Sequence, residues 1–291
     1  MTGRSQAPGR ARSGLVTSLL LAPATFWYLV LLVLPLAIVA IYSFGVRAPD
    51  GGYQTAFTFD NYGTLLKRPA PFTLSLVIAI SGTLLCGLLA FPLAYFIATR
   101  AGKRKGILLV LLIIPFWTSF LIRTISLVII LGSDGIGGFL SDLTGQNVQI
   151  LGTMWAVLIG IVYNYLPLMI FPVYVTLERL DRTLLEASKD LGAGRWATFR
   201  QVTLPIVWPG LITGSILVFI PLMGEYVVPA ILGNGKVFLI GNVLQLDFLS
   251  SRDWPAGSAK AVTLILVMLV TVSFYLWVTN RGRRGREVSL L

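Results

Sequence analysis

The chain has 291 residues, of which 56% are hydrophobic and only 12% are charged. A soluble domain usually has about 25% charged residues, so this composition excludes an ordinary soluble domain and indicates a membrane protein. The absence of histidine removes the commonest general base, and a single cysteine cannot form an internal disulfide.

Six apolar segments follow one another along the chain. Each reaches the roughly 20 residues that cross about 30 Å of hydrocarbon as a helix, and none alternates in polarity as a membrane-barrel strand does. They cover residues 19–44, 73–99, 107–131, 151–177, 207–232 and 259–280. We therefore predict an all-α membrane protein with six transmembrane helices in one domain, residues 19–280. The first segment is too long for a signal peptide and is interpreted as an uncleaved span.

Basic residues beside the apolar segments predict the orientation of the chain. Sixteen of the 23 Lys and Arg residues lie in the tails 1–18 and 281–291, the connection 100–105 and the loop 178–206. Only five lie in the other connections. The basic side of a membrane protein faces the cytoplasm, so both tails and the loop 178–206 are expected to be cytoplasmic. The net charge of +11 is spread over these short stretches, which favours topology signals and contact with membrane lipid over nucleic-acid binding.

The loop 178–206, between the fourth and fifth segments, is charged and yet carries a helical stripe. Apolar residues recur at steps of three and four, which places them on one helix face: Leu177, Leu180, Leu184, Ala187 and Leu191. Thr183 and Glu186 stand in capping-box register, so a helix can begin there. Gly192 and Gly194 allow a sharp turn after that helix. The loop is therefore predicted to be a short amphipathic helix that ends in a glycine corner.

A second short helix is expected after the corner. Trp196, Phe199 and Val202 resume a helical stripe, and Pro205 and Pro209 mark the entry to the next span. A helix, a corner and a helix at a membrane surface form a shape that fits a groove on a soluble subunit.

The same loop resembles the EAA loop of bacterial ABC importer permeases. The family pattern is Glu-Ala-Ala, three residues, Gly, nine residues, Ile, any residue and Leu-Pro; Ser188 and Val202 are mild departures from it. The resemblance implies a type I ABC importer permease (MetI-like) architecture, whose loop inserts into a cleft of the ATP-hydrolysing subunit. It implies these ATPase-coupling residues: Glu186, Ala187, Ser188, Gly192, Leu204 and Pro205. The alternative is an ordinary interfacial hairpin in which Glu186 only caps a helix.

The chain carries no phosphate-binding loop of the G-x-x-x-x-G-K-[ST] type. If the chain belongs to an ATP-driven transporter, ATP and Mg must therefore bind to a separate partner ATPase. This chain is then expected to be a transport subunit without its own cofactor, not an enzyme. The resemblance implies a dimer of ABC ATPases, a second permease subunit and an extracytoplasmic substrate-binding protein as partners in a bacterial inner membrane.

Other segments resemble spermidine/putrescine importer permeases, specifically the first of the two permeases in such systems. They are Pro115–Arg123, Leu180–Ala187, Gly224–Pro229, Ile240–Val243 and Arg252–Pro255. The resemblance implies putrescine or spermidine as cargo. Permeases for other organic cations, opines or other small solutes are similar and stay open as alternatives.

Candidate pathway residues follow from charge and aromatic character. Glu225 lies within the fifth apolar segment, where a charge costs at least about 2.5 kcal/mol, so it should face a cavity or a partner. Aromatic rings that can face a cation are Trp117, Tyr163, Tyr165 and Tyr226. Asp247 and Asp253 can attract cations on the outer side. The alternatives are that Glu225 pairs with Arg123 or with the second permease, that the aromatics pack or form an interfacial belt, and that the two aspartates form a solvated loop edge or a contact for the extracytoplasmic binding protein.

Three other classes of protein fit the sequence less well. An ion-coupled secondary transporter needs a self-contained ion site, and one acidic residue within six spans supports it poorly. A membrane enzyme needs a nucleophile–base pair or a metal cluster, and the sequence offers neither. A purely structural scaffold does not account for a carboxylate and several prolines within the spans.

Overall fold

The fold was examined in a computed structural model that describes residues 20–287. The predicted tail 1–18 and the last four residues of the predicted tail 281–291 lie outside the described residues. Within the described part, six helices are long and apolar enough to cross a membrane: Leu20–Tyr42, Ala70–Thr99, Phe120–Thr144, Met154–Glu178, Arg195–Met223 and Trp254–Trp277. The prediction of six transmembrane helices is confirmed.

The elements run in the following order. The first half holds η1 (Leu29–Val33), α2 (Leu34–Tyr42), β1 (Val46–Arg47), β2 (Tyr53–Gln54), α3 (Asp60–Lys67), α4 (Ala70–Thr99), η2 (Gly102–Arg104), α5 (Lys105–Trp117), α6 (Phe120–Leu131) and α7 (Ile136–Thr144). The second half holds α8 (Met154–Glu178), α9 (Arg182–Asp190), α10 (Arg195–Thr198), η3 (Phe199–Thr203), α11 (Leu204–Met223), α12 (Val227–Leu232), α13 (Ile240–Gln245), η4 (Leu246–Ser250) and α14 (Trp254–Glu287).

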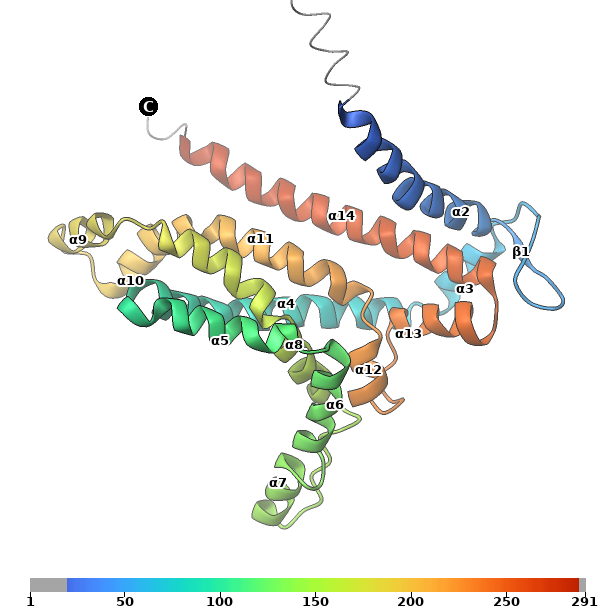
Figure 1. Ribbon diagram of the computed structural model, residues 1–291, viewed down its shortest axis with the longest axis horizontal. Coiled ribbons are helices and arrows are strands. Elements are labelled where there is room, and N and C mark those ends of the chain that lie inside the picture. The colour runs from blue at the N-terminus through green and yellow to red at the C-terminus, as the bar shows by residue number, and fades with distance from the viewer. Residues whose placement is uncertain (1–19, 288–291) are drawn as a thin grey trace, which may run out of the picture.

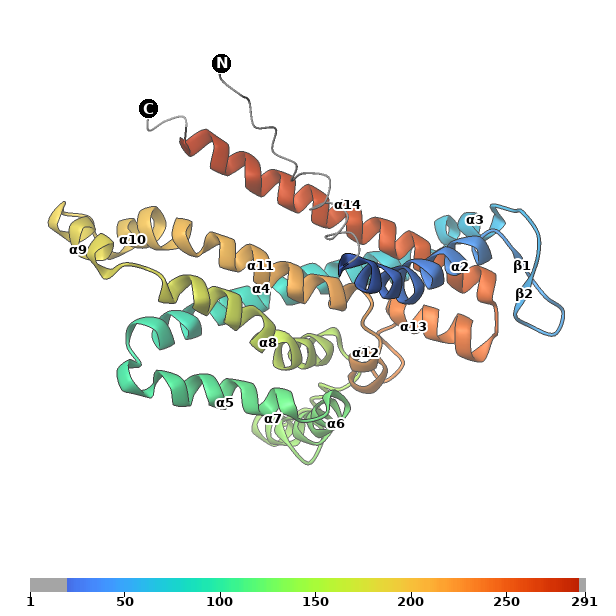
Figure 2. The ribbon, with the colours of Figure 1, turned by 45° about the horizontal axis from the view of Figure 1, so that its top comes forward.

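The core lies where α4, α8 and α11 pack together. The elements α9 and α10 lie at one extremity of the molecule, here called the loop end (Figure 1). The hairpin of β1 and β2 and the helix α3 lie at the other, here called the hairpin end, and α14 runs from there toward the loop end in both views (Figures 1 and 2). The span Leu20–Tyr42 buries none of its apolar window within this chain, so it presents that surface to lipid or to another chain.

The hairpin end brings two distant loops together. β1 and β2 form a two-stranded antiparallel pair, a small exception to the all-helical prediction. The Gly52 N–H donates to the Arg252 carbonyl at 2.6 Å, and an Arg47 guanidinium nitrogen donates to the Ser251 carbonyl at 2.6 Å. Arg47 and Arg252 belong to the connections with few basic residues, which are expected on the side opposite the cytoplasm. Their contact is consistent with that expectation.

The third predicted span, 107–131, is divided into two helices. α5 ends at Trp117, Thr118 and Ser119 are extended, and α6 starts at Phe120 and leaves in another direction (Figure 1). Pro115 has no N–H to donate to the preceding turn, and the Thr118 hydroxyl donates to the Pro115 carbonyl at 2.7 Å. Such local side-chain bonds compete with helix continuation, and continuous apolar composition does not reveal them.

The fifth predicted span, 207–232, also differs from a single helix. At its start, α10, η3 and α11 form one continuous helical run, so Pro205 lies in the first turn of α11 and does not separate a second short helix from the span. Proline has no N–H to donate to the preceding turn, and that preceding turn is the irregular π-helical segment η3. Near its end the span breaks at Gly224, Glu225 and Tyr226, and α12 resumes at Val227.

Close contact between α8 and α11 depends on small residues. A Cβ built on Gly210 of α11 would lie 2.5 Å from the Pro172 carbonyl oxygen and 2.4 Å from the Thr176 hydroxyl of α8. The first neighbour is backbone, so a side chain at this position must push the two helices apart. Small residues allow such backbone approach in membrane helix pairs.

We predict that Gly210→Ala lowers the stability of the protein in detergent by about 1–3 kcal/mol, the usual cost of overpacking. The matched control is Gly87→Ala in α4, where the nearest atom to a new Cβ is 3.7 Å away and alanine improves helix propensity. The melting temperatures of the two variants check the prediction, and equal melting temperatures would contradict it.

Candidate functional site

The helix α9 is held at its start by Asp181. Its carboxylate accepts a hydrogen bond from the Thr183 N–H at 3.0 Å, and the helix begins at Arg182. The predicted start at Thr183 is therefore corrected, because the N-cap is the aspartate two residues earlier. The hydrogen bond from the Thr183 backbone lowers the pKa of the Asp181 carboxyl, which keeps a negative charge at the positive end of the helix dipole.

The glycine corner has the expected geometry at Gly192. Its φ is +79°, its N–H donates to the Lys189 carbonyl at 2.8 Å, and the Ala193 N–H donates to the Ser188 carbonyl at 3.1 Å. This is the Schellman pattern of helix termination, which favours glycine at the left-handed residue. Gly194 has a φ of −66° and precedes α10, so only Gly192 supplies the left-handed conformation.

The predicted coupling residues occupy two levels of the loop. Glu186, Ala187 and Gly192 are exposed at its tip, and Ser188 is half-buried. Leu204 and Pro205 lie at its base, half-buried at the beginning of α11. The structure therefore gathers the Glu-Ala-Ser segment and the glycine at one exposed place and assigns the Leu-Pro pair to the junction with the membrane helix.

The apolar stripe of the loop is divided between the core and an open surface. Leu177 and Leu180 are 2% and 9% exposed, whereas Leu184, Leu191 and Trp196 are 47%, 89% and 71% exposed. We call these last three side chains the apolar loop surface. Large exposed apolar side chains beside charged ones are typical of a protein–protein contact.

A side-chain contact that the sequence did not predict braces the loop. The Ser188 and Thr198 hydroxyl oxygens lie 3.0 Å apart and share a hydrogen bond, which ties α9 to α10. Thr198 is 8% exposed, so the contact is partly shielded from water. Ser188 stands where the family pattern has alanine, and the departure from that pattern was the signal for this contact.

Glu225 lies at the break in the fifth span and is 5% exposed. One carboxylate oxygen accepts from the Val227 N–H at 2.8 Å and the Val228 N–H at 3.2 Å. The other accepts from the Tyr165 hydroxyl of α8. The Val227 and Val228 N–H groups are the first backbone donors of α12 and have no intrahelical acceptor. Glu225 therefore supplies their acceptor and, through Tyr165, ties this break in the span to α8.

Arg123 lies near this corner, but it does not form the ion pair with Glu225 that the sequence allows. Among the described residues, the ion pairs are Lys105–Glu178 and Lys260–Asp247. Arg123 is 7% exposed, and its guanidinium lies 5.4 Å and 5.9 Å from the ring centroids of Phe116 and Phe120. Its Nε has no hydrogen-bond partner in the described part of the chain.

The other candidate pathway residues are distributed around the molecule. Trp117, Tyr163 and Tyr226 are 86%, 43% and 43% exposed, so their rings are available to lipid, to another chain or to a passing solute. The fourth aromatic candidate, Tyr165, is the hydroxyl donor to Glu225.

The two outer aspartates are occupied within the chain. Asp247 forms an ion pair with Lys260, and both side chains are mostly buried, at 13% and 17% exposure. Asp253 accepts from the Ala256 N–H at 3.2 Å at the start of α14. Both residues therefore stabilise the connection from η4 to α14, and neither is a free solvated edge.

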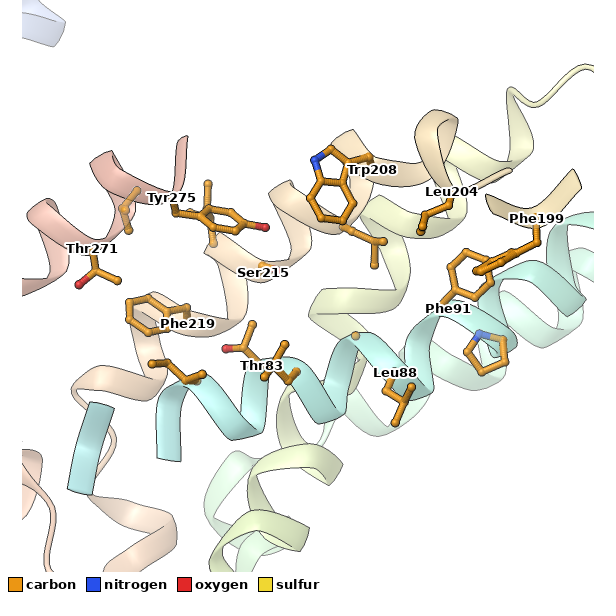
Figure 3. Close-up of a pocket in the computed structure, with 17 residues that line it drawn as sticks. Thr83, Leu88, Phe91, Phe199, Leu204, Trp208, Ser215, Phe219, Thr271 and Tyr275 are labelled. Atoms are coloured by element: carbon orange, nitrogen blue, oxygen red, sulfur yellow. The ribbon is translucent and has the colours of Figure 1, made fainter. Parts of the chain in front are cut away.

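A cavity of about 700 Å³ lies between α4, α11 and α14. Figure 3 shows Phe91, Phe199 and Leu204 at one end and Phe219 and Thr271 at the other. Its lining is largely apolar, and Leu204 is the predicted site residue that contributes to it.

Comparisons with known proteins agree with the architecture. Residues 90–284 match the family described as "Binding-protein-dependent transport system inner membrane component". The chain is similar to the spermidine/putrescine transport system permease protein PotB of Escherichia coli K12, with 40% identity over 261 residues covering 88% of this chain and 94% of that protein. The Haemophilus influenzae PotB is 37% identical over 254 residues, covering 86% of this chain and 89% of that protein.

A solved structure has the same fold. A bacterial ABC transporter involved in the import of the acidic polysaccharide alginate aligns with a TM-score of 0.68, 20% sequence identity, and coverage of 93% of this chain and 96% of that one. At this identity the likeness concerns the fold alone.

We predict that Glu225→Gln and Glu225→Leu differ in stability. The glutamine side-chain oxygen still accepts from the two α12 N–H groups, whereas leucine leaves them and the Tyr165 hydroxyl without an acceptor. An unsatisfied buried donor costs about 1–3 kcal/mol, so Glu225→Leu should lose that much stability and Glu225→Gln much less. Thermal unfolding in detergent checks this, and an equally unstable glutamine variant would contradict the capping role.

Proposed function

The chain belongs to the binding-protein-dependent transport system inner membrane component family, and from this premise we propose that it is one permease subunit of an ATP-driven polyamine importer. As a multi-pass inner membrane protein, it forms half of the translocation pathway. The second permease forms the other half, two ABC ATPase chains lie on the cytoplasmic side, and an extracytoplasmic binding protein delivers the cargo.

The observation that carries the proposal is the loop between α8 and α11. It presents the apolar loop surface of Leu184, Leu191 and Trp196 beside the exposed Glu186. It is rigid through its Schellman corner and the Ser188–Thr198 bond. Exposed apolar side chains set among charged ones on such a projection are typical of a contact with a protein partner, and we infer that the loop enters a cleft on a soluble subunit.

ATP acts on this chain indirectly, by binding to the separate ATPase subunits. Binding of ATP brings the two motor subunits together, and each holds one loop in its cleft. The loops move with the motors and shift the membrane helices between two arrangements, one open to each side. The driving force is the difference in ATP affinity between these two states.

The cargo assignment rests on the relatives and on charge. The two PotB proteins are named for spermidine and putrescine transport, and the resemblance of residues 115–123 and 224–229 points to the same class. Glu225, at the break in the fifth span, supplies negative potential within the membrane, and the exposed aromatic rings offer weak cation contacts of about 0.5–2 kcal/mol each. Weak contacts suit a pathway in which a delivering protein provides the selectivity.

We predict that cells with the complete assembly accumulate radiolabelled spermidine or putrescine, and that Glu225→Gln reduces this uptake while assembly is retained. The glutamine keeps the hydrogen bonds to the first N–H groups of α12 but removes the negative charge. A loss of amine uptake without a loss of assembly would therefore show that the charge interacts with the cargo. Unlabelled thiamine and an opine serve as competitors in the same cells. Failure of wild-type cells to accumulate either labelled amine, or complete inhibition of that uptake by thiamine or the opine, would contradict the polyamine assignment.

We predict that Gly192→Val uncouples ATP hydrolysis from transport. Valine is disfavoured at a φ of +79°, so the corner must change its shape and the loop no longer matches the cleft. The matched control is Gly194→Val, since Gly194 has an ordinary φ of −66° and open space around it. The ratio of solute transported to ATP hydrolysed in proteoliposomes checks the prediction. An unchanged ratio in Gly192→Val, or an equal loss in both variants, would argue against it.

A further inference from the structure

The loop contacts a membrane helix that is distant from it in sequence. The Trp196 ring stacks on the Phe199 ring with centroids 5.3 Å apart. Phe199 in turn meets Phe91 of α4 edge-to-face with centroids 5.4 Å apart. Phe91 stacks on Tyr95, one turn further along α4, at 6.1 Å. Aromatic rings therefore connect the exposed loop to α4, although the loop is covalently joined only to α8 and α11.

The contact lies where the helix has an irregular turn. Phe199 is the first residue of η3, a π-helical segment between α10 and α11. The wider turn shifts the hydrogen-bond register by one residue, and such segments within a helix often mark functional sites. The structure thus places a π-helical turn between α10 and α11.

There is also space next to this ring. Phe91, Phe199 and Leu204 line one end of the 700 Å³ cavity (Figure 3). Side chains in close-packed interiors have little room to shift, whereas the Phe199 ring borders an open volume. Movement of the loop about η3 can therefore displace the ring without breaking the core of α4, α8 and α11.

The two short helices of the loop are tied together ahead of this turn. The hydrogen bond between Ser188 and Thr198 ties α9 to α10, and Thr198 directly precedes Phe199. A push on the exposed tip is therefore delivered to the first residue of η3.

We propose that Phe199 is a positioning residue that transmits displacement of the loop to α4 through Phe91, with η3 as the joint. The proposal rests on the proposed function, since it assumes that a motor displaces the loop. Without this contact the motor would act on α8 and α11 alone, and α4 would follow only through general packing.

The test uses the complete assembly in lipid nanodiscs, in a Cys86→Ser background, with spin labels at Lys189 in α9 and Ala101 after α4. ATP with vanadate drives the conformational change, so the readout is independent of cargo. The distance between the labels should stay nearly constant in the wild type and should change in Phe199→Leu and in Phe91→Leu. The solute-to-ATP ratio should fall about two- to tenfold, the effect of losing one aromatic pair.

Two comparisons separate transmission from general packing. The double variant Phe199→Leu/Phe91→Leu should be no worse than either single variant, because the same contact is lost. Phe219→Leu removes a ring from the opposite end of the same cavity and should leave both readouts unchanged. Phe199→Trp, which keeps a ring, should retain most of the coupling.

Three results would overturn the proposal. The first is a label distance in Phe199→Leu that stays as constant under ATP with vanadate as it does in the wild type. The others are effects of Phe219→Leu as large as those of Phe199→Leu, and a loss in the double variant equal to the product of the two single losses. Loss of assembly in both Phe199→Leu and the unbranched, more flexible Phe199→Met would overturn it as well, since the contact would then serve folding. Failure of the proposed cargo has a different signature: wild-type cells would not take up the amines, while the label distance under ATP with vanadate would still stay constant in the wild type and change in Phe199→Leu.

Discussion

Backbone N–H and C=O groups inside hydrocarbon have no water to bond with, so each one must find a partner within the protein. This constraint governs where the helices run and where they break. Helical hydrogen bonds satisfy most of these groups in the core helices α4, α8 and α11, although each contains proline, and Gly210 allows α8 and α11 to approach closely. At the break between α11 and α12, the Glu225 carboxylate accepts the first two N–H groups of α12. A charged residue within the fifth span is thereby the reason that the chain can turn there.

The spans and the loop could be predicted from the sequence because their signals are local. Long apolar runs determine the six helices, and the spacing from Glu186 to Pro205 carries the family resemblance, which the comparisons confirm. The breaks at Thr118 and Gly224 were not predicted, because both lie within apolar runs and depend on how hydroxyl and carboxyl groups bond to nearby backbone. The partners of distant polar residues, such as Lys260 for Asp247 and Tyr165 for Glu225, depend on tertiary packing.

One part of the candidate site is predicted by the sequence motif, and the other part depends on tertiary packing. The tip of the loop follows the motif, but its rigidity comes from Ser188 and Thr198, ten residues apart. The candidate pathway residues do not share one location: Glu225 and Tyr165 are joined by a hydrogen bond, whereas Asp247 and Asp253 stabilise the entry to α14. The fold itself is shared with a solved structure of a bacterial ABC transporter at 20% identity.

Coupling to a cytoplasmic motor requires the loop between α8 and α11 to face the cytoplasm. A cysteine at Leu191, 89% exposed, in a Cys86→Ser background can be labelled with a membrane-impermeant maleimide in right-side-out and inside-out vesicles. The account predicts labelling only in inside-out vesicles, and protection of that cysteine when the ATPase subunits are bound. Labelling in right-side-out vesicles would place the loop outside the cell and contradict coupling to a cytoplasmic motor.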